Sequence, residues 1–205
     1  MPRMSWEELS EILDKGLERL DMTIEKKAKH RIVSLSEGLP HYTHLLGLDA
    51  AQRAILDDRD AIKMSDVNAA ITTAVDNAQQ SIRTAYHRAT SSPRKDALYA
   101  KVLLACALTP TDDLGYFSAS NVKGPVSRIM KKPYDIPAFA RHLNDFTEEK
   151  HGSIMERTGT ARRYKFRFVN PLLQPYIILH GLAKGLLDEG TLRDLQPEKG
   201  IQGLS

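Results

Sequence analysis

The chain has 205 residues, of which 41% are hydrophobic and 27% are charged, a composition that predicts a folded soluble protein of one large or two small domains. Its single cysteine, Cys106, lies in an apolar run over residues 97–108 that is too short to span a bilayer. With no disulfide framework and no secretory segment, we expect a buried, inert thiol in a cytoplasmic protein that has no membrane partner.

The net charge of +3 conceals a difference between the two halves of the chain. Residues 1–90 carry 12 basic and 14 acidic side chains, whereas residues 91–205 carry 17 basic and 12 acidic ones. A basic surface for an anionic partner is therefore expected in the second half.

Residues 1–90 are expected to form a first domain of four helices. Ser5 and Glu8 form a capping box at the start of the first helix, and apolar residues then recur at helical spacing. The expected helices run from about Ser5 to Asp21, from Thr23 to Gly38, from Pro40 to Ile55, and from Ser65 to Arg88.

Gly38-Leu39-Pro40 separates the second and third of these helices. The glycine supplies the left-handed residue that ends one helix, and the proline favours the first position of the next. The two helices must therefore meet at a sharp, fixed corner that can hold a ligand. His41 and His44 follow at a spacing that metal sites use, but no third ligand accompanies them, so a zinc site is disfavoured.

Residues 91–187 are expected to form the second domain, after a linker over residues 89–93. An apolar helix is expected to end at Thr109, a second to run through Ile129 with an interruption or kink at Gly124-Pro125, and a third to start at Pro137. The period then changes to two, which predicts a β-hairpin with strands over residues 154–158 and 163–169. A closing helix follows, and residues 188–205 are expected to be a flexible tail.

Three helices, a hairpin and a closing helix are the parts of a winged helix-turn-helix domain. Five cations concentrate on the hairpin, where they suit the phosphates that flank a DNA groove; these are Arg157, Arg162, Arg163, Lys165 and Arg167. A second interpretation is that exposed strands carry such cations for solubility. The third helix adds Arg141, but it also carries Asp145, Glu148 and Glu149, which repel phosphates and leave a protein-facing domain open.

Catalytic motifs are missing from the sequence. It contains no phosphate loop, no strand that ends in paired acids for magnesium, and no serine in a nucleophile elbow. The chain by itself is therefore not expected to be an enzyme.

The corner at Gly38-Leu39-Pro40, the helix entered through Ser65-Asp66-Val67, and the run from Arg163 to Leu173 together resemble the C-terminal part of AAA+ or STAND-type P-loop ATPases. The similarity is to prokaryotic relatives of the origin-recognition initiators, and it covers residues 5–187. It implies a mainly α fold, in which a four-helix AAA+ lid-type bundle precedes a winged helix-turn-helix domain with one β-hairpin.

The resemblance also implies a nucleotide site that the lid shares with an upstream core, which this chain lacks. ATP or ADP with magnesium is expected in the full-length parent, with Gly38, Leu39, Pro40 and His41 on the adenine side. Lids of this family often place a second-sensor arginine near the start of the third helix, where this chain has His41.

Two functions follow as expectations. In the first, the lid contributes to a nucleotide site and the winged helix binds DNA. In the second, the winged helix is a protein-interaction module in a signalling or assembly ATPase. A free-standing transcription regulator is disfavoured, because residues 1–90 show neither an effector pocket nor a dimerising coiled coil.

Overall fold

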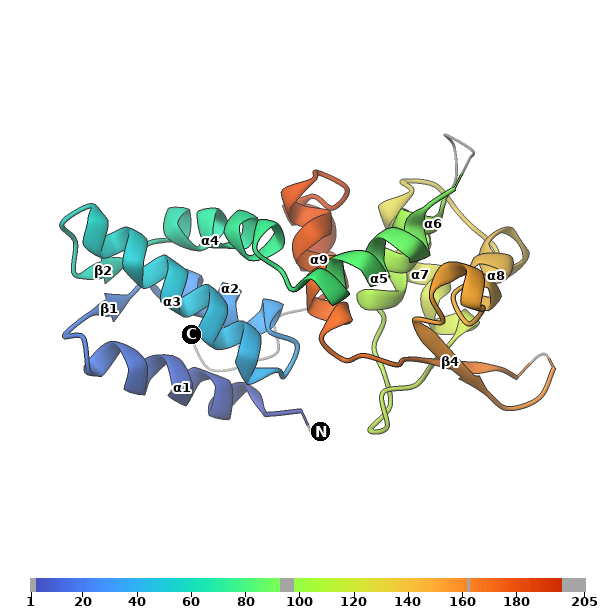
Figure 1. Ribbon diagram of the computed structural model, residues 1–205, viewed down its shortest axis with the longest axis horizontal. Coiled ribbons are helices and arrows are strands. Elements are labelled where there is room, and N and C mark those ends of the chain that lie inside the picture. The colour runs from blue at the N-terminus through green and yellow to red at the C-terminus, as the bar shows by residue number, and fades with distance from the viewer. Residues whose placement is uncertain (1–2, 93–97, 162, 197–205) are drawn as a thin grey trace. The chain divides into compact units, whose positions relative to one another are not determined.

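The computed structural model describes residues 3–92, 98–161 and 163–196. These residues form two compact units, one within residues 3–78 and the other within residues 79–195. Both units are mainly helical, and each contains one small sheet, as Figure 1 shows. The expectation of a mainly α fold is therefore confirmed. In the part of the chain that the structure describes, no helix combines the length and the apolar character needed to cross a membrane.

The first unit packs its helices around aliphatic side chains that recur at helical spacing, such as Leu9, Leu13 and Leu17. Its helices are α1 (Trp6–Glu18), α2 (Lys26–Leu35), α3 (Pro40–Leu56) and α4 (Met64–Asp76), and its strands are β1 (Thr23–Ile24) and β2 (Ala61–Ile62). The two strands pair in parallel, with Thr23 opposite Ala61. This pair ties the entry of α2 to the entry of α4. Sequence periodicity does not reveal it, because two residues make no alternating pattern.

The helix expected from Ser65 to Arg88 is two helices. α4 ends at Asp76, Asn77 caps it, and Gln79 leaves the helical region with φ −52° and ψ 140° before α5 (Gln80–Thr90) begins. Asparagine competes for backbone hydrogen bonds and favours helix ends, whereas the apolar stripe across this point consists mostly of alanine. The second compact unit begins at Gln79, so α5 belongs to it and precedes the linker expected at residues 89–93.

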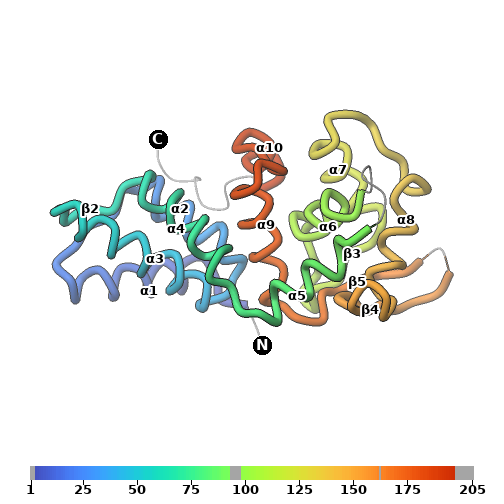
Figure 2. The backbone as a smooth tube through the Cα atoms, turned by 45° about the horizontal axis from the view of Figure 1, so that its top comes forward, coloured from blue at the N-terminus to red at the C-terminus, as the bar shows by residue number. Residues whose placement is uncertain are grey.

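The second unit continues with five α-helices and an antiparallel sheet in the strand order β3-β5-β4, which Figure 2 shows from another side. After α5 its elements are α6 (Tyr99–Ala107), β3 (Phe117–Ser118), α7 (Ala119–Ile129), α8 (Ile136–Asp145), the 3-10 turn η1 (Glu149–His151), β4 (Met155–Thr158), β5 (Lys165–Phe168), α9 (Leu173–Ala183) and α10 (Glu189–Leu195). In the sheet, Phe117 pairs with Phe166, and Met155 pairs with Phe168.

The core of the second unit is formed by α6, α9 and the inner face of the sheet. Cys106 is buried within α6, as expected, and burial raises the pKa of its thiol far above the usual range. Phe166 and Phe168 also face the core, as the alternating pattern predicts. In the strand expected over residues 163–169, Tyr164 would also face the core. That expectation is wrong, because Tyr164 precedes β5 and is only partly buried.

Two further expectations about this unit need correction. Gly124-Pro125 does not interrupt α7, which runs continuously from Ala119 to Ile129 with Pro125 buried inside it. The expectation of a flexible tail over residues 188–205 is wrong for residues 189–195, which form α10, and residues 197–205 lie outside the described residues. Leu192 on this helix is 5% exposed. A single buried leucine in a polar segment is too weak a periodic signal to predict such a helix.

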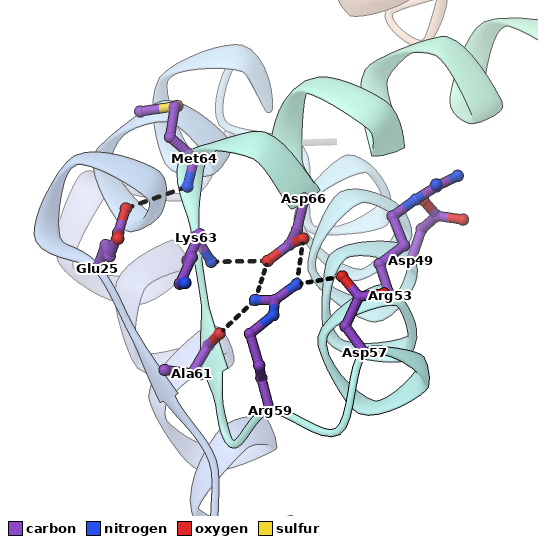
Figure 3. A network of polar contacts seen from close by, with 9 residues as sticks. All are labelled: Glu25, Asp49, Arg53, Asp57, Arg59, Ala61, Lys63, Met64 and Asp66. Carbon is purple, nitrogen blue, oxygen red and sulfur yellow. Dashed lines mark hydrogen bonds and ion pairs between the residues drawn. The ribbon is translucent and has the colours of Figure 1, made fainter.

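An arginine holds the loop between α3 and α4, as Figure 3 shows. The Arg59 guanidinium donates to both carboxylate oxygens of Asp66 at 2.9 and 2.8 Å, and also to Asp57 and to the Ala61 carbonyl. Asp66, which is 5% exposed, accepts a further hydrogen bond at 2.8 Å from the backbone N–H of Lys63 at the start of α4. The hydrogen bond from Arg59 lowers the pKa of the Asp66 carboxyl.

Replacing Asp66 by asparagine is expected to destabilise the first unit by about 2 to 4 kcal/mol, because the change leaves the Arg59 guanidinium without its main buried partner. Urea unfolding measures this loss. A matched control is Glu11→Gln, which breaks the exposed pair with Lys15 and is expected to cost at most about 1 kcal/mol.

The cost of Asp66→Asn should also depend on pH. The folded-state pKa of Asp66 lies below its unfolded value of 3.8, so the pair stabilises the fold fully above that value. The stabilisation is lost as the pH falls through the lower, folded-state pKa. The difference between the melting temperatures of the unmodified and Asp66→Asn proteins should therefore begin to narrow as the pH falls below about 3.8. A difference that persists unchanged there would show that the ion pair is not its source.

Candidate functional site

The corner between α2 and α3 is built from two successive residues in the left-handed region. α2 ends at Leu35, Glu37 has φ 50° and Gly38 has φ 76°, after which Leu39 caps α3 and Pro40 occupies its first turn. Glycine adopts a positive φ without steric cost, and proline fixes φ for a helix start. The sharp corner that the sequence predicts is therefore present.

The segment before α1 lies against this corner. The Met4 N–H donates to the Gly38 carbonyl at 2.9 Å, and the Arg3 guanidinium donates to the Glu37 carbonyl. A Cβ added at Gly38 would stand 2.7 Å from the Arg3 Cβ and 3.2 Å from the Met4 carbonyl oxygen. Sequence reasoning missed Arg3 as a corner residue, because 34 positions separate it from Glu37 and no local pattern links them.

The side chains predicted for the adenine side differ in accessibility. Leu39 is 1% exposed and lies in the core, so it supports the corner from inside. Pro40 is partly exposed, and His41 is exposed and packs edge to face on Tyr42 with ring centroids 5.3 Å apart. His44 is also exposed. Among the described residues, no group of three or more His, Cys, Asp or Glu side chains is arranged to hold a metal ion.

The hairpin of the second unit carries the other predicted site, and acids compensate part of its charge. Lys165 pairs with Asp112 at 2.9 Å, and its ammonium lowers the pKa of that carboxyl. Arg167 pairs at 2.5 Å with Glu156, the residue directly opposite it in the ladder. These two cations are therefore already bound within the unit.

Tyr116 completes the group at the base of the hairpin. Its hydroxyl donates to Glu156 Oε1 at 2.6 Å, and this bond lowers the pKa of the Glu156 carboxyl. The Arg167 guanidinium also lies over the Tyr116 ring, 4.6 Å from its centroid. Glu156 could have been found from the hairpin register. Asp112 could not, because it lies 53 residues from Lys165.

The remaining hairpin cations that the structure describes are Arg157 in β4 and Arg163 before β5. Arg157 donates to the neutral side-chain oxygen of Asn144 at 2.8 Å and stacks over Tyr164 at 4.3 Å, so its charge is not neutralised by a carboxylate in the described part of the chain. Arg163 is exposed, and its side chain has no ion-pair partner among residues 3–92, 98–161 and 163–196. Arg162 lies outside the described residues.

The positive charge of Arg141 on α8 is compensated by an acid, as are the charges of Lys165 and Arg167. Its Nε lies 3.6 Å from Asp145 Oδ2, which also accepts a 2.6 Å hydrogen bond from the Tyr99 hydroxyl. Of the predicted cations that the structure describes, Arg157 and Arg163 therefore face no carboxylate, whereas Arg141, Lys165 and Arg167 each face an acid.

A scan against models of protein families finds no match to this chain, and a search of curated proteins finds no significant match either.

Substituting Gly38 by alanine is expected to destabilise the first unit by about 1 to 2 kcal/mol, because the residue has a positive φ and its new methyl group would meet the Arg3 side chain. Urea unfolding measures the change. The control is Gly16→Ala on α1, where a Cβ would have no neighbour within 4 Å; this change should instead stabilise by about 0.5 to 1 kcal/mol. Equal effects at the two positions would contradict a special role for the corner.

Proposed function

We propose that this chain is the lid and winged-helix region of an AAA+ or STAND-type ATPase, and that its second unit binds duplex DNA. The observation that carries the proposal is the order of elements in that unit: a helix, a strand, two helices and a hairpin, with the strands in the order β3-β5-β4. This is the order of a winged helix-turn-helix domain, in which α7 and α8 are the helix-turn-helix pair and the connection from β4 to β5 is the wing.

The distribution of charge favours contacts between the wing and phosphates. Arg157 and Arg163 face no carboxylate in the described residues, so they can neutralise phosphates at little cost. The position for a recognition helix belongs to α8, but its Arg141 already faces Asp145. Contacts from the wing position a protein on DNA without reading its sequence. We therefore expect affinity that depends strongly on salt and weakly on base sequence.

In the first unit the proposal places nucleotide beside the corner at Gly38. Pro40 and His41 are accessible there, and the Arg3 guanidinium lies at the same corner. A neutral imidazole at the position of the second-sensor arginine makes a weaker contact with a γ-phosphate than a guanidinium does. The corner residues therefore suit adenine and ribose better than the γ-phosphate. The phosphate loop and the magnesium ligands would come from the upstream core.

One observation favours protein docking as the second candidate. Leu114 is 70% exposed and Val169 is 59% exposed. Leu114 lies in the turn before β3, where its carbonyl accepts from the Arg167 guanidinium at 3.2 Å, and Val169 directly follows β5. Apolar side chains beside ion-paired cations suit a protein partner better than a phosphate backbone.

The DNA proposal predicts that Arg157→Ala with Arg163→Ala weakens binding to a duplex by about tenfold at low salt and lowers the slope of log affinity against log salt by about 1 per arginine. Fluorescence anisotropy with a labelled duplex at several salt concentrations measures both quantities. The matched control is Arg83→Ala with Lys101→Ala, two exposed cations of the same unit on α5 and α6.

The affinity of the Arg83→Ala, Lys101→Ala control for the duplex should stay close to that of the unmodified chain. Binding that ignores salt, or that falls equally in the two double variants, would contradict phosphate contact through the wing. Loss of a protein partner upon Leu114→Ser, with no DNA binding, would support the second candidate instead.

The nucleotide proposal predicts a difference between two exposed histidines of α3. In a longer protein that includes the phosphate-loop core, His41→Ala should lower ATP affinity several-fold, because it removes a side chain beside the corner. His44→Ala, about one turn further along α3, should have little effect. Isothermal titration calorimetry measures both, and equal affinities in the two variants would rule out a nucleotide contact by His41.

A further inference from the structure

A second group of cations lies on α7 and in the turn that follows it. Lys123, Arg128, Lys131 and Lys132 are all exposed. Lys123 pairs with the neighbouring Asp135 at 2.7 Å, and Lys132 lies over the Tyr134 ring at 5.3 Å. Arg128 and Lys131 instead form ion pairs with Asp194 and Asp188, which lie in a segment after α9. That segment therefore compensates their positive charge.

That segment is α10 with the residue before it. Arg128 NH1 lies 3.0 Å from Asp194 Oδ2, and Lys131 Nζ lies 3.3 Å from Asp188 Oδ2. α10 packs on α7, and Leu192, which lies between the two acids in sequence, is 5% exposed. Figure 2 shows where α10 follows α9 in the second unit. The helix and the residue before it thus place two carboxylates beside these exposed cations, and the buried Leu192 anchors the helix.

The contacts between α10 and α7 are expected to be weak. The helix has seven residues, which is too short to be stable without tertiary contacts. Its ion pairs are exposed, with Arg128 at 52% and Asp194 at 65% side-chain exposure, and such pairs contribute little. A polyanion with one charge per about 1.7 Å presents a higher charge density than two separate carboxylates. Such a ligand can compete for the same cations.

In a helix-turn-helix pair the first helix crosses the DNA backbone while the second enters the groove. Here α7 is that first helix, and Arg128 and Lys131 lie at its C-terminal end and in the turn. We propose that these two residues form a second phosphate-binding surface, that α10 is an acidic cover over it, and that duplex DNA and α10 compete for it. This inference rests on the proposed binding of DNA by the second unit.

The test is Asp188→Asn with Asp194→Asn in the full chain, titrated with a labelled duplex of about 30 base pairs. Removing both acids should tighten binding about 3- to 10-fold at low salt and increase the salt slope by up to about 1.8, or 0.9 for each phosphate contacted. Adding Arg128→Ala and Lys131→Ala should abolish the gain. In the chain that keeps both acids, Arg128→Ala with Lys131→Ala should alter the affinity for DNA little, because Asp194 and Asp188 already pair with these two side chains.

Two controls separate the cover from other effects. Asp113→Asn with Glu149→Gln changes the net charge equally at exposed acids that do not contact α7 through any ion pair in the described residues. Leu192→Ser loosens α10 without changing charge and should also tighten binding. Circular dichroism verifies that each variant keeps its helical content.

Each result decides the proposal. Tighter binding by the Asp188/Asp194 variant and by Leu192→Ser, but not by the Asp113/Glu149 control, supports the cover. If the unmodified chain binds DNA through Arg157 and Arg163 but no variant binds more tightly, the cover is wrong and the proposed function stands. Equal tightening by the charge control overturns the cover as well. If neither the unmodified chain nor the neutralised variant binds DNA, the proposed function fails, and this inference fails with it.

Discussion

The central position of β5 determines both the core and the surface of the second unit. Because β5 pairs with β3 on one side and with β4 on the other, Phe166 and Phe168 fall on the buried face, where they pack near Phe117. The same alternation places Lys165 and Arg167 on the outer face, within reach of acids from the elements on either side. One strand thus fixes which side chains stabilise the fold and which of its cations remain available to a ligand.

The positive charge available to a ligand is consequently smaller than the formal net charge of the sequence suggests. The second half of the chain is basic overall, but many of its cations are bound by carboxylates in pairs such as Arg167 with Glu156 and Arg128 with Asp194. For a phosphate to bind such a cation it must displace the carboxylate, and the two interactions are similar in strength. Net electrostatic gain comes from cations that face no acid, and among the predicted hairpin cations that the structure describes these are Arg157 and Arg163.

Local signals in the sequence predicted those features of the fold that depend on neighbouring residues. The Gly38 corner, the Ser5 capping box of α1 and the alternation in β5 are each specified within a few positions. Contacts between distant segments were not predictable, because no local pattern encodes them. Arg3 at the corner and the Asp112 partner of Lys165 are examples. The break after Asp76 was missed for a further reason: alanine continues a helical stripe without contributing enough burial to require one helix.

The proposed DNA binding would have two regimes, one for cations that face no acid and one for cations held in ion pairs. Arg157 and Arg163 would engage phosphates without breaking an internal pair, so their contribution would follow the release of counterions from DNA. Arg128 and Lys131 would engage phosphates only after Asp188 and Asp194 withdraw, which would free two carboxylates to attract counterions of their own. Salt would therefore weaken α10 and the protein–DNA contact together. The balance between the two is then set by charge density and by the burial of Leu192, which salt does not screen.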